Sequence, residues 1–354
     1  MADDHKTHPK PGPPLDKAKK NGPRIAILGA GFSGMGMAIR LLQEGFDNFV
    51  IYEKAQEVGG TWRENRYPGV ACDVPSHLYS FSFEPNPNWS RRFSPGGEIW
   101  DYMKHCAEKY GLYPYIRFGK TVSAIGHDGH KWNVDFADGD RAFADYVISG
   151  LGGLHQPSIP DFPGADDFEG PIFHTAQWRD DVDLKGKRVA MIGSAASAVQ
   201  VIPEIVDHVD HLDVYQRTPN WVMPRESYRY PGWVKRLFKM FPPLMRAYRG
   251  FYFSFLEWRF GAFQKNDNYV KRYVRKTFQQ HLEAQVRDPV LRAKLTPDYP
   301  VGCKRILISD DYLPAIQREN VDLVTGPIAG IASKGVRTKD GKERPADAII
   351  MATG

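Results

Sequence analysis

Residues Arg24 to Gly34 read RIAILGAGFSG, and this stretch decides the fold. A short apolar run that contains β-branched side chains and is followed at once by glycines predicts a buried strand that enters a tight turn. The pattern continues as a helix over Phe32 to Glu44 and a second strand over Phe49 to Tyr52. Together these segments predict one βαβ unit, and therefore a fold of the α/β class.

The turn reads Gly29-Ala30-Gly31-Phe32-Ser33-Gly34, a GxGxxG motif between a strand and a helix. Its first glycine permits the turn, the second lets the backbone approach a pyrophosphate, and the third allows the helix to pack closely on the strand. The start of the helix, at Phe32 and Ser33, offers free N–H donors and a favourable dipole to the same phosphates. Glu53 ends the second strand 19 residues after Gly34, where an acid can accept hydrogen bonds from both ribose hydroxyls. The motif predicts a dinucleotide site; the alternative is a glycine turn without a ligand.

A second unit of the same kind has strands at Arg188 to Ile192 and His211 to Tyr215, with a helix from about Ser197. Its turn is degenerate, because alanines replace the later glycines, and by itself it suits simple helix packing equally well. After the second strand, where an NAD site would carry an acid, the chain has Gln216-Arg217-Thr218. An arginine and a hydroxyl at this place suit the 2′-phosphate of NADP, although an arginine at a strand end also suits plain solvent exposure. The candidate NADP residues of this unit are Gly193, Ser194, Ala195, Ser197, Ala198, Arg217 and Thr218.

Proline and glycine mark the boundary between two domains. The stretch from Gly150 to Gly164 holds four glycines and three prolines in fifteen residues, which is typical of a crossing between domains. We predict one dinucleotide-binding domain over 23–150 and a second over 151–330, the latter with an aromatic, basic and mostly helical insertion over about 225–300. Residues 331–354 predict strands that return towards the first domain, and residues 1–22, which are polar and rich in Pro and Lys, predict a disordered tail.

Shorter strands follow from the turn residues between them. Lys131 to Phe136 and Phe143 to Ile148 predict a hairpin around the turn sequence at 137–140. Further strands are expected at Val321 to Val324 and Ala348 to Met351. The last of these runs into a glycine at which the sequence stops, and a folded domain rarely finishes on a core strand. We therefore expect the chain to be truncated at its C-terminus.

Composition and charge exclude several classes of protein. Three scattered cysteines are too few for a disulfide framework and form no CxxC pair for zinc, so we expect a reducing, cytoplasmic setting and no metal. No stretch reaches the roughly 20 apolar residues that a membrane span needs. Between Arg225 and Lys276 the chain has 13 Lys and Arg against 3 Asp and Glu. Such a segment suits a phosphorylated cofactor, a membrane surface or nucleic acid. No nucleic-acid motif accompanies it, and a solvated helical surface is the simplest interpretation. Peripheral contact with a membrane is the alternative.

Two dinucleotide folds in one chain imply two nucleotides, and a flavin reduced by a nicotinamide is the commonest reason for that arrangement. Disulfide reductases carry a redox pair of cysteines shortly after the first fold. The corresponding stretch here is Gly59-Gly60-Thr61-Trp62, which has tryptophan and no paired cysteine. The sequence therefore disfavours that class.

Two longer stretches resemble the fingerprints of Baeyer–Villiger monooxygenases, which are class B flavoprotein monooxygenases related to the flavin-containing monooxygenases. Gly59 to Asp73 reads GGTWRENRYPGVACD, and Phe168 to Trp178 reads FEGPIFHTAQW. The first is similar to the family pattern small-Gly-x-Trp, followed after four residues by aromatic-Pro-Gly and after three more by Asp. The second is similar to the family pattern Phe-x-Gly-x3-His-x3-Trp. The family usually continues with Pro or Asp, whereas here Arg179 intervenes. Relatives that oxidise nitrogen or sulfur typically have Tyr or Phe in place of Trp178, so the tryptophan favours the Baeyer–Villiger branch.

The resemblance, which runs from about residue 24 to the end, implies two Rossmann-like domains, FAD-binding over 23–150 and NADP-binding over 151–330, with the second inserted in the first. In YPVGCKR at 299–305 it implies that Arg305 lies over the flavin and that Lys304 assists the NADP phosphate. It implies that Asp73 orients Arg305, as a carboxylate holds a guanidinium in place to stabilise developing negative charge. The alternatives are a structural ion pair or no contact. The remaining residues expected near the flavin are Gly60, Thr61, Trp62 and Tyr67, which equally suit core packing.

The implied activity is monooxygenation that depends on FAD and NADPH. One oxygen atom of O2 would enter a ketone and give an ester or lactone. The alternatives are oxygenation at nitrogen or at the sulfur of a sulfide, and a nucleotide-binding fragment without activity. The family places His174 near the interdomain linker, which suits a hinge or positioning role, and a buried structural histidine is an equal alternative. Trp221 and Trp258 in the insertion could border a substrate site or a membrane-facing entrance, while helical packing is simpler.

Overall fold

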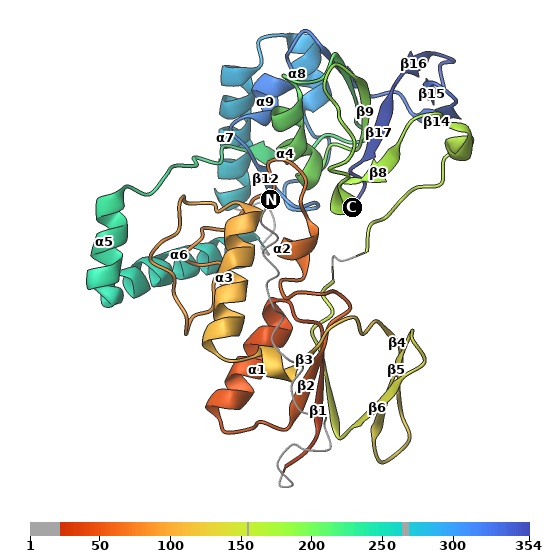
Figure 1. Ribbon diagram of the computed structural model, residues 1–354. Coiled ribbons are helices and arrows are strands. Elements are labelled where there is room, and N and C mark those ends of the chain that lie inside the picture. Colours follow the sequence, from red (N-terminus) through yellow and green to blue (C-terminus); the bar gives the residue numbers. More distant parts are fainter. Residues whose placement is uncertain (1–21, 154–155, 264–268) are drawn as a thin grey trace, which may run out of the picture. The chain divides into compact units, whose positions relative to one another are not determined.

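The computed structural model describes residues 22–153, 156–263 and 269–354, which divide into two compact units (Figure 1). Unit 1 comprises Met1–Glu64 and Gly97–His155, and unit 2 comprises Asn65–Gly96 and Gln156–Gly354. Except for Gly22, the tail predicted at 1–22 lies outside the described residues. The units differ from the predicted boundaries in one large respect, because residues 65–96 pack with unit 2 and not with the first dinucleotide fold. The hydrogen bonds that hold this segment are described with the site.

Unit 1 is built on a four-stranded parallel sheet in the order β3-β2-β1-β7. The predicted strands at the first turn are confirmed as β1 (Ile25–Leu28) and β2 (Phe49–Tyr52), every residue of which is buried. The helix between them, α1 (Phe32–Gln43), is also confirmed. The other elements of the unit are α2 (Thr61–Glu64), α3 (Gly96–Lys109), the 3-10 turn η2 (Tyr113–Tyr115), β3 (Ile116–Arg117) and β7 (Tyr146–Ser149).

The predicted hairpin is only partly confirmed. Antiparallel strands β4 (Val122–His127), β5 (Trp132–Phe136) and β6 (Arg141–Ala144) form a separate sheet. The expected second strand at 143–148 is in fact divided, because the chain leaves β6 at Asp145 and continues as β7, which pairs in parallel with β1. The Asp145 carboxylate accepts a hydrogen bond of 2.7 Å from the backbone N–H of Arg24 at the foot of β1. This bond holds the chain at the place where it changes sheets.

Unit 2 contains a five-stranded parallel sheet in the order β13-β10-β9-β17-β8. One face packs on helices α4, α7 and α9, and the other is covered by the antiparallel strands β14 to β16 (Figure 1). The predicted strands 188–192, 211–215, 321–324 and 348–351 are confirmed. The strand bounds are β8 (Ile172–His174), β9 (Arg188–Ile192), β10 (His211–Tyr215), β13 (Val321–Val324), β14 (Ile328–Ala332), β15 (Gly335–Thr338), β16 (Glu343–Pro345) and β17 (Ala348–Met351). The helix bounds are α4 (Ala196–Ile205), α7 (Tyr269–Gln285) and α9 (Tyr312–Ala315), with 3-10 turns η3 (Ala165–Asp167) and η4 (Thr175–Gln177).

The predicted return of residues 331–354 towards the first domain is corrected for β17. This strand lies between β9 and β8 in the middle of the unit 2 sheet, with all four of its residues buried. Asp347, just before it, exchanges backbone and side-chain hydrogen bonds with Arg188 at the start of β9. An apolar strand that is covered on both faces is most stable inside a sheet of this kind.

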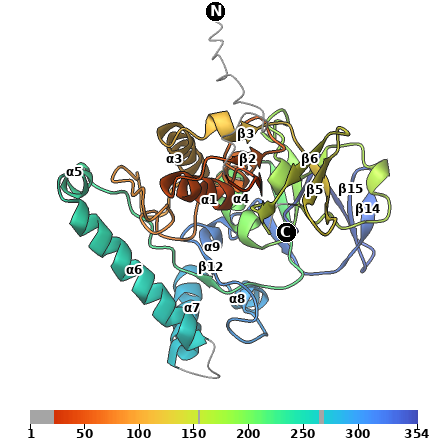
Figure 2. The same ribbon diagram turned by 90° about the horizontal axis from the view of Figure 1, so that it is seen from below.

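The insertion is helical, as predicted, and consists of α5 (Gly232–Met240), α6 (Pro242–Phe263), α7 and α8 (Pro289–Leu295). Figure 2 shows α6 as a long helix that runs from α5 to the region of α7. Two short parallel strands, β11 (Val222–Met223) and β12 (Leu307–Ile308), close the insertion at its base. Across the described ranges, none of the helices combines the length and apolar character that crossing a bilayer requires.

The packing of α1 on β1 makes a direct prediction. A Cβ at Gly34 would overlap the backbone carbonyl oxygen of Gly29. We expect Gly34→Ala to lower the free energy of unfolding by about 1–3 kcal/mol, because the overlapping atom belongs to the backbone and the turn must shift. Urea denaturation monitored by circular dichroism measures the effect. The matched control is Gly97→Ala in α3, where nothing lies within 4 Å of the added Cβ; equal stability of the two variants would contradict the prediction.

Candidate nucleotide-binding and active site

The first glycine turn has the backbone geometry that a phosphate site requires. Gly29 has a φ of 96°, and a Cβ there would lie 2.7 Å from the carbonyl oxygen of Gly150. Helix α1 follows at Phe32, and no side chain caps its N-terminus at Gly31. The first N–H groups of the helix are therefore left for a ligand. Gly34 is buried in the helix–strand contact, while Phe32 is half-buried and Ser33 is exposed.

Glu53 lies directly below this turn and is 6% exposed. One carboxylate oxygen accepts a hydrogen bond of 2.7 Å from the N–H of Ala30, and the other accepts one of 2.9 Å from the N–H of Ala55. The sequence predicts a ribose contact for Glu53 but gives no sign of this bracing role. Each carboxylate oxygen has a further lone pair, so support of the turn leaves room for a hydroxyl donor.

A second loop lies against the first turn. The N–H of Gly59 donates to the carbonyl of Ala30 at 3.0 Å, and Gly60 packs backbone to backbone against Gly31. Gly60 has a φ of 50°, and its Cβ would lie 3.2 Å from the Cα of Gly31. The glycines therefore form a narrow cradle of backbone into which side chains do not project. Thr61 and Trp62 begin the short helix α2 at the edge of this cradle, the former exposed and the latter half-buried.

The turn of unit 2 repeats this geometry despite its alanines. Gly193 has a φ of 113°, helix α4 begins three residues later, and no side chain caps the helix at Ala195. Ala198, at the place of the third glycine, is fully buried and packs in the core. The Ser194 carbonyl accepts a hydrogen bond from Asn220, and Ser197 accepts one from Thr175. The degenerate motif therefore keeps the open helix N-terminus that anion binding needs.

The residues expected to select NADP lie after β10 in the same unit. Gln216 is buried and donates to the carbonyl of Lys294 at 2.8 Å, so its role is structural. Arg217 is exposed and forms no ion pair with any residue that the structure describes. The Tyr299 hydroxyl donates to the carbonyl of Pro219 at 3.0 Å, and Lys304 Nζ lies 4.8 Å from the centre of the Tyr299 ring. This contact brings the loop that carries Lys304 to the segment that carries Arg217 and Thr218.

Asp73 and Arg305 are 232 positions apart in the chain and form an ion pair within unit 2. The Arg305 side chain is 58% exposed and that of Asp73 is 31% exposed. The predicted contact between the two side chains is therefore present. Their exposure leaves the guanidinium accessible to a ligand, because a carboxylate occupies only part of its five N–H donors.

The loop that carries Asp73 is held by a residue that the sequence does not reveal. Gln200 on α4 donates to the carbonyl of Ala71 at 3.0 Å and accepts from the Tyr67 hydroxyl at 3.0 Å. Its side-chain oxygen also lies 3.4 Å from the N–H of Ala71. Gly69 packs so closely on α4 that a Cβ there would overlap the carbonyl oxygen of Gln200. These contacts explain why residues 65–96 belong to unit 2.

Arg225 supports the same loop from the other side. Its guanidinium donates to the carbonyl of Cys72 at 3.1 Å and lies 5.3 Å from the centre of the Phe93 ring. Burial lowers the pKa of Arg225 from its usual value. Asp73 follows directly after this anchored carbonyl, so the carboxylate position is fixed by backbone contacts as well as by its ion pair.

Comparison with known proteins agrees with this arrangement of turns and loops. Residues 22–290 match the profile of the family described as flavin-binding monooxygenase-like. The chain belongs to the flavin-binding monooxygenase-like family. It is 45% identical over 333 residues to a protein of Streptomyces coelicolor named Baeyer-Villiger monooxygenase, covering 94% of this chain and 64% of the relative. A Pseudomonas aeruginosa protein of the same name is also 45% identical, with 63% of its length covered. The chain thus spans a little less than two thirds of these relatives.

Solved structures show the same fold for this family member. A steroid monooxygenase bound to NADP matches with a TM-score of 0.82 and 30% sequence identity, over 94% of this chain and 72% of that one. An open crystal structure of cyclohexanone monooxygenase matches with a TM-score of 0.80 and 27% identity, over 94% and 73% of the two chains. The predicted class, an α/β protein with two dinucleotide-binding folds, is confirmed.

The titratable groups beside the ion pair of this flavin-binding monooxygenase-like chain are neutral. Burial, and after it the negative charge of Asp73, raises the pKa of Tyr67 to about 12. Burial also raises the pKa of the Cys72 thiol to about 12. Tyr67 is therefore a hydrogen-bond donor at neutral pH and Cys72 is not a thiolate nucleophile. Cys72, which is 2% exposed, is a packing residue.

The second fingerprint of the family forms an edge of the unit 2 sheet. His174 ends β8, is 3% exposed, and accepts a hydrogen bond of 3.0 Å at Nδ1 from the N–H of Ala176. Burial lowers the pKa of His174, so the ring is neutral at pH 7. Trp178 packs edge-on against Phe173 in the core. These contacts give the histidine a capping role in the described structure and no access to solvent for proton transfer.

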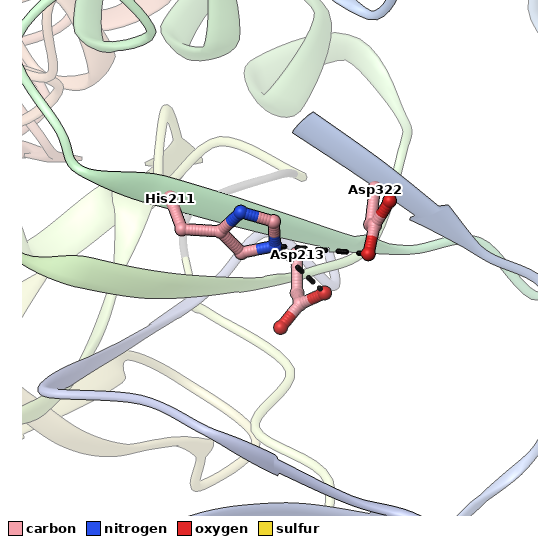
Figure 3. Close-up of side chains that lie close together, drawn as sticks. All are labelled: His211, Asp213 and Asp322. Atoms are coloured by element: carbon pink, nitrogen blue, oxygen red, sulfur yellow. Dashed lines mark ion pairs between the residues drawn. The ribbon is translucent and has the colours of Figure 1, made fainter. Parts of the chain in front are cut away.

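A further group of titratable side chains lies on β10 and β13. His211 Nε2 is 3.5 Å from an oxygen of Asp213 and 3.7 Å from one of Asp322 (Figure 3). Such a set has the donor atoms of a metal site. Arg344 on β16, however, donates to both carboxylates at 2.8 and 2.9 Å. A guanidinium already binds both acids, so the cluster attaches β16 to the sheet.

The Gln200 contacts yield a test of loop positioning. We expect Gln200→Ala to lower the free energy of opening the loop at 67–73 away from α4 by about 1–3 kcal/mol, because one side chain supplies hydrogen bonds to Tyr67 and Ala71. Hydrogen–deuterium exchange of peptides that cover this loop should become faster. Gln279→Ala, an exposed position on α7 of the same unit, is the control and should leave the exchange unchanged. Unaltered loop exchange in Gln200→Ala would show that packing alone holds the loop.

Proposed function

We propose that this protein is a monooxygenase that uses FAD and NADPH to insert one oxygen atom of O2 into a ketone, giving an ester or lactone. The observation that carries the proposal is the ion pair between Asp73 and Arg305. Asp73 ends one fingerprint of the Baeyer–Villiger type and Arg305 ends the stretch at 299–305. The 45% identity to two proteins named Baeyer-Villiger monooxygenase supports the same activity.

The two glycine turns fit the two cofactors. We assign FAD to the turn at 29–34 with Glu53 for the ribose, and the loop with Gly60, Thr61 and Trp62 to its neighbourhood. The narrow backbone cradle at Gly31 and Gly60 supports this assignment, because any side chain there would fill the space. We assign NADP to the turn at 193–198, with Arg217, Thr218 and Lys304 for the 2′-phosphate. A steroid monooxygenase of the same fold is described as bound to NADP.

The chain's own residues supply the electrostatic part of the mechanism. A bound flavin, once reduced by NADPH, supplies the electrons for the activation of O2. The Arg305 guanidinium stabilises negative charge that develops on oxygen. Asp73 fixes the direction of the guanidinium, and Gln200 and Arg225 fix the loop that carries Asp73. Tyr67 stays protonated beside them, so it adds a hydrogen-bond donor and no competing negative charge.

The setting of the enzyme follows from its cysteines. Cys72 and Cys106 are buried free thiols, and Cys303 is exposed and free. An exposed thiol persists in a reducing compartment. We therefore propose a cytoplasmic location.

The proposed substrates are O2 and a ketone, with a sulfide as the alternative to the ketone.

The role of Arg305 can be measured directly. We expect Arg305→Ala to lower the rate of oxygenated product formation by about 100- to 1000-fold, because a preorganised charge is lost from the reaction. Product is measured as ester or lactone over a panel of ketones, beside sulfoxide from a sulfide. The control Arg318→Ala removes an exposed arginine that pairs with Asp207 in the same unit. If the complete gene product consumes NADPH with every ketone and forms only hydrogen peroxide, the proposed reaction is wrong. A purified chain 1–354 that binds no added FAD would support the fragment alternative.

The coenzyme assignment has its own test. We expect Arg217→Ala to raise the KM for NADPH by roughly 10- to 100-fold, the value of one charge-assisted hydrogen bond to phosphate. The KM for NADH, which has no 2′-phosphate, should change little. Arg287→Ala, an exposed arginine of the same unit, should leave both constants unchanged. An equal rise in both KM values would place Arg217 away from the phosphate.

A further inference from the structure

Exposed apolar side chains gather where α5 meets α6. We call Met240, Phe241, Pro242, Pro243 and Leu244 the apolar tip; all five are exposed, and Met240 reaches 66% and Phe241 57%. Figure 2 shows the tip between α5 and the long helix α6. A run of consecutive exposed apolar residues is unusual on a water-facing surface, and it marks an interaction site.

The apolar surface continues along one face of α6. Leu244, Phe251, Phe255 and Trp258 follow one another at intervals of seven, four and three residues, which places them on one face of a helix. Their exposed fractions are 44%, 64%, 42% and 61%. The rings of Phe251, Phe255 and Trp258 lie stacked one after another along the helix. We call this row the aromatic stripe.

Another side of the two helices is firmly packed within unit 2. Phe238 and Met245 are buried, and Phe238 contacts the ring of His77. Arg249 donates to the carbonyls of His77 and Leu78 at 2.8 and 2.7 Å. These contacts fix the orientation of both helices. The tip and the stripe are therefore held in fixed positions on unit 2.

Positive charge surrounds the apolar tip. Arg236, Lys239 and Arg246 are exposed and form no ion pair with any of the described residues. From Gly232 to Trp258 the chain has five Lys and Arg and a single acid, Glu257. A water-facing helix of ordinary composition would intersperse both signs of charge. This combination instead matches a surface that carries negative charge above an apolar interior.

We propose that the apolar tip and the aromatic stripe insert into the interfacial region of a membrane that contains anionic lipids. Helices with Trp, Phe and Leu on one face and Lys and Arg beside it lie in the plane of the membrane interface without crossing it. The unpaired cations at Arg236, Lys239 and Arg246 would contact lipid phosphates, while Trp258 suits the boundary between headgroups and acyl chains. This inference goes beyond the oxygenation reaction and does not depend on it.

Cosedimentation with lipid vesicles tests the proposal. The protein should bind vesicles that contain phosphatidylglycerol, bind phosphatidylcholine vesicles at least about tenfold more weakly, and lose affinity as salt is added. The variant Arg236→Glu/Lys239→Glu/Arg246→Glu should lose at least roughly 100-fold in affinity, since each basic residue contributes about fivefold at an anionic surface and each glutamate adds repulsion. All three residues are exposed, so this variant is expected to fold.

The apolar contribution needs a variant and control of its own. We expect Met240→Ser/Phe241→Ser/Leu244→Ser to reduce binding at least roughly tenfold. Ile125→Ser/Phe143→Ser is the matched control, because both residues are 47% exposed on the antiparallel sheet of unit 1. Brominated acyl chains should quench part of the tryptophan fluorescence of the protein. That quenched part should be missing in the variant Trp233→Phe/Trp258→Phe. This signal reports insertion even if the serine variant fails to fold.

Three results would overturn the proposal. The first is absence of binding to anionic vesicles at low salt. The second is self-association that the tip variant abolishes while vesicle binding is unchanged, which would assign the face to a second copy. The relatives are longer than this chain, so the assay is repeated with the complete gene product. The third is failure of that product to bind when residues 1–354 do bind, which would show that another part of the polypeptide covers the face. NADPH oxidation without lipid serves as an independent readout of the oxygenation reaction.

Discussion

One backbone hydrogen bond organises each half of this protein. In unit 1 the N–H of Gly29 donates to the carbonyl of Tyr52 at 2.8 Å, and in unit 2 the N–H of Gly193 donates to the carbonyl of Tyr215 at 3.0 Å. In both cases a glycine at positive φ turns the chain from one buried strand into a helix, and the neighbouring strand ends beside it. The open helix N-terminus that results is the feature on which both proposed nucleotide sites depend.

The candidate active site is assembled by two loops that unit 2 holds in place. Asp73 and Arg305 come from distant parts of the sequence, yet both loops are fixed within unit 2 by several independent contacts. Gln200 and Arg225 bind the backbone carbonyls of Ala71 and Cys72 just before Asp73, and Tyr299 ties the loop of Arg305 to Pro219. A charged pair that is half exposed contributes little to stability by itself. Its precise placement therefore comes from the hydrogen bonds to the backbone around it.

The sequence predicts the central strands within about one residue, because short, mostly apolar runs that contain β-branched residues favour a buried strand. It fails where tertiary contacts decide. The strand expected at 143–148 is divided at Asp145, since the side chain of that residue binds the backbone of Arg24, just before β1. Residues 65–96 were predicted to belong with the first fold because they follow it in the chain, but Gln200 and the close approach of Gly69 attach them to α4. Residues 331–354 were predicted to return towards the first domain, whereas β17 lies between β9 and β8 in the unit 2 sheet.

The candidate site shows the same division. The contact of Asp73 with Arg305 was predicted from the family resemblance and is confirmed, whereas spacing alone gave no reason to expect it. Gln200 was missed because an amide in a helix carries no motif, and its two roles appear only when the loop lies against it. Likewise, Glu53 was assigned to a ribose, and its support of the Ala30 and Ala55 amides depends on a backbone path that no local pattern encodes.

Helix α4 has the proposed phosphate-binding turn at its N-terminus and, one turn further on, the Gln200 side chain that holds the Asp73 loop. An anion that orders the first turn of this helix also restrains the residue that positions the carboxylate. By thermodynamic linkage, the free energy by which a bound coenzyme stabilises the ordered loop equals the free energy by which the ordered loop strengthens coenzyme binding. Coenzyme retention and readiness of Arg305 are then two measurements of one equilibrium.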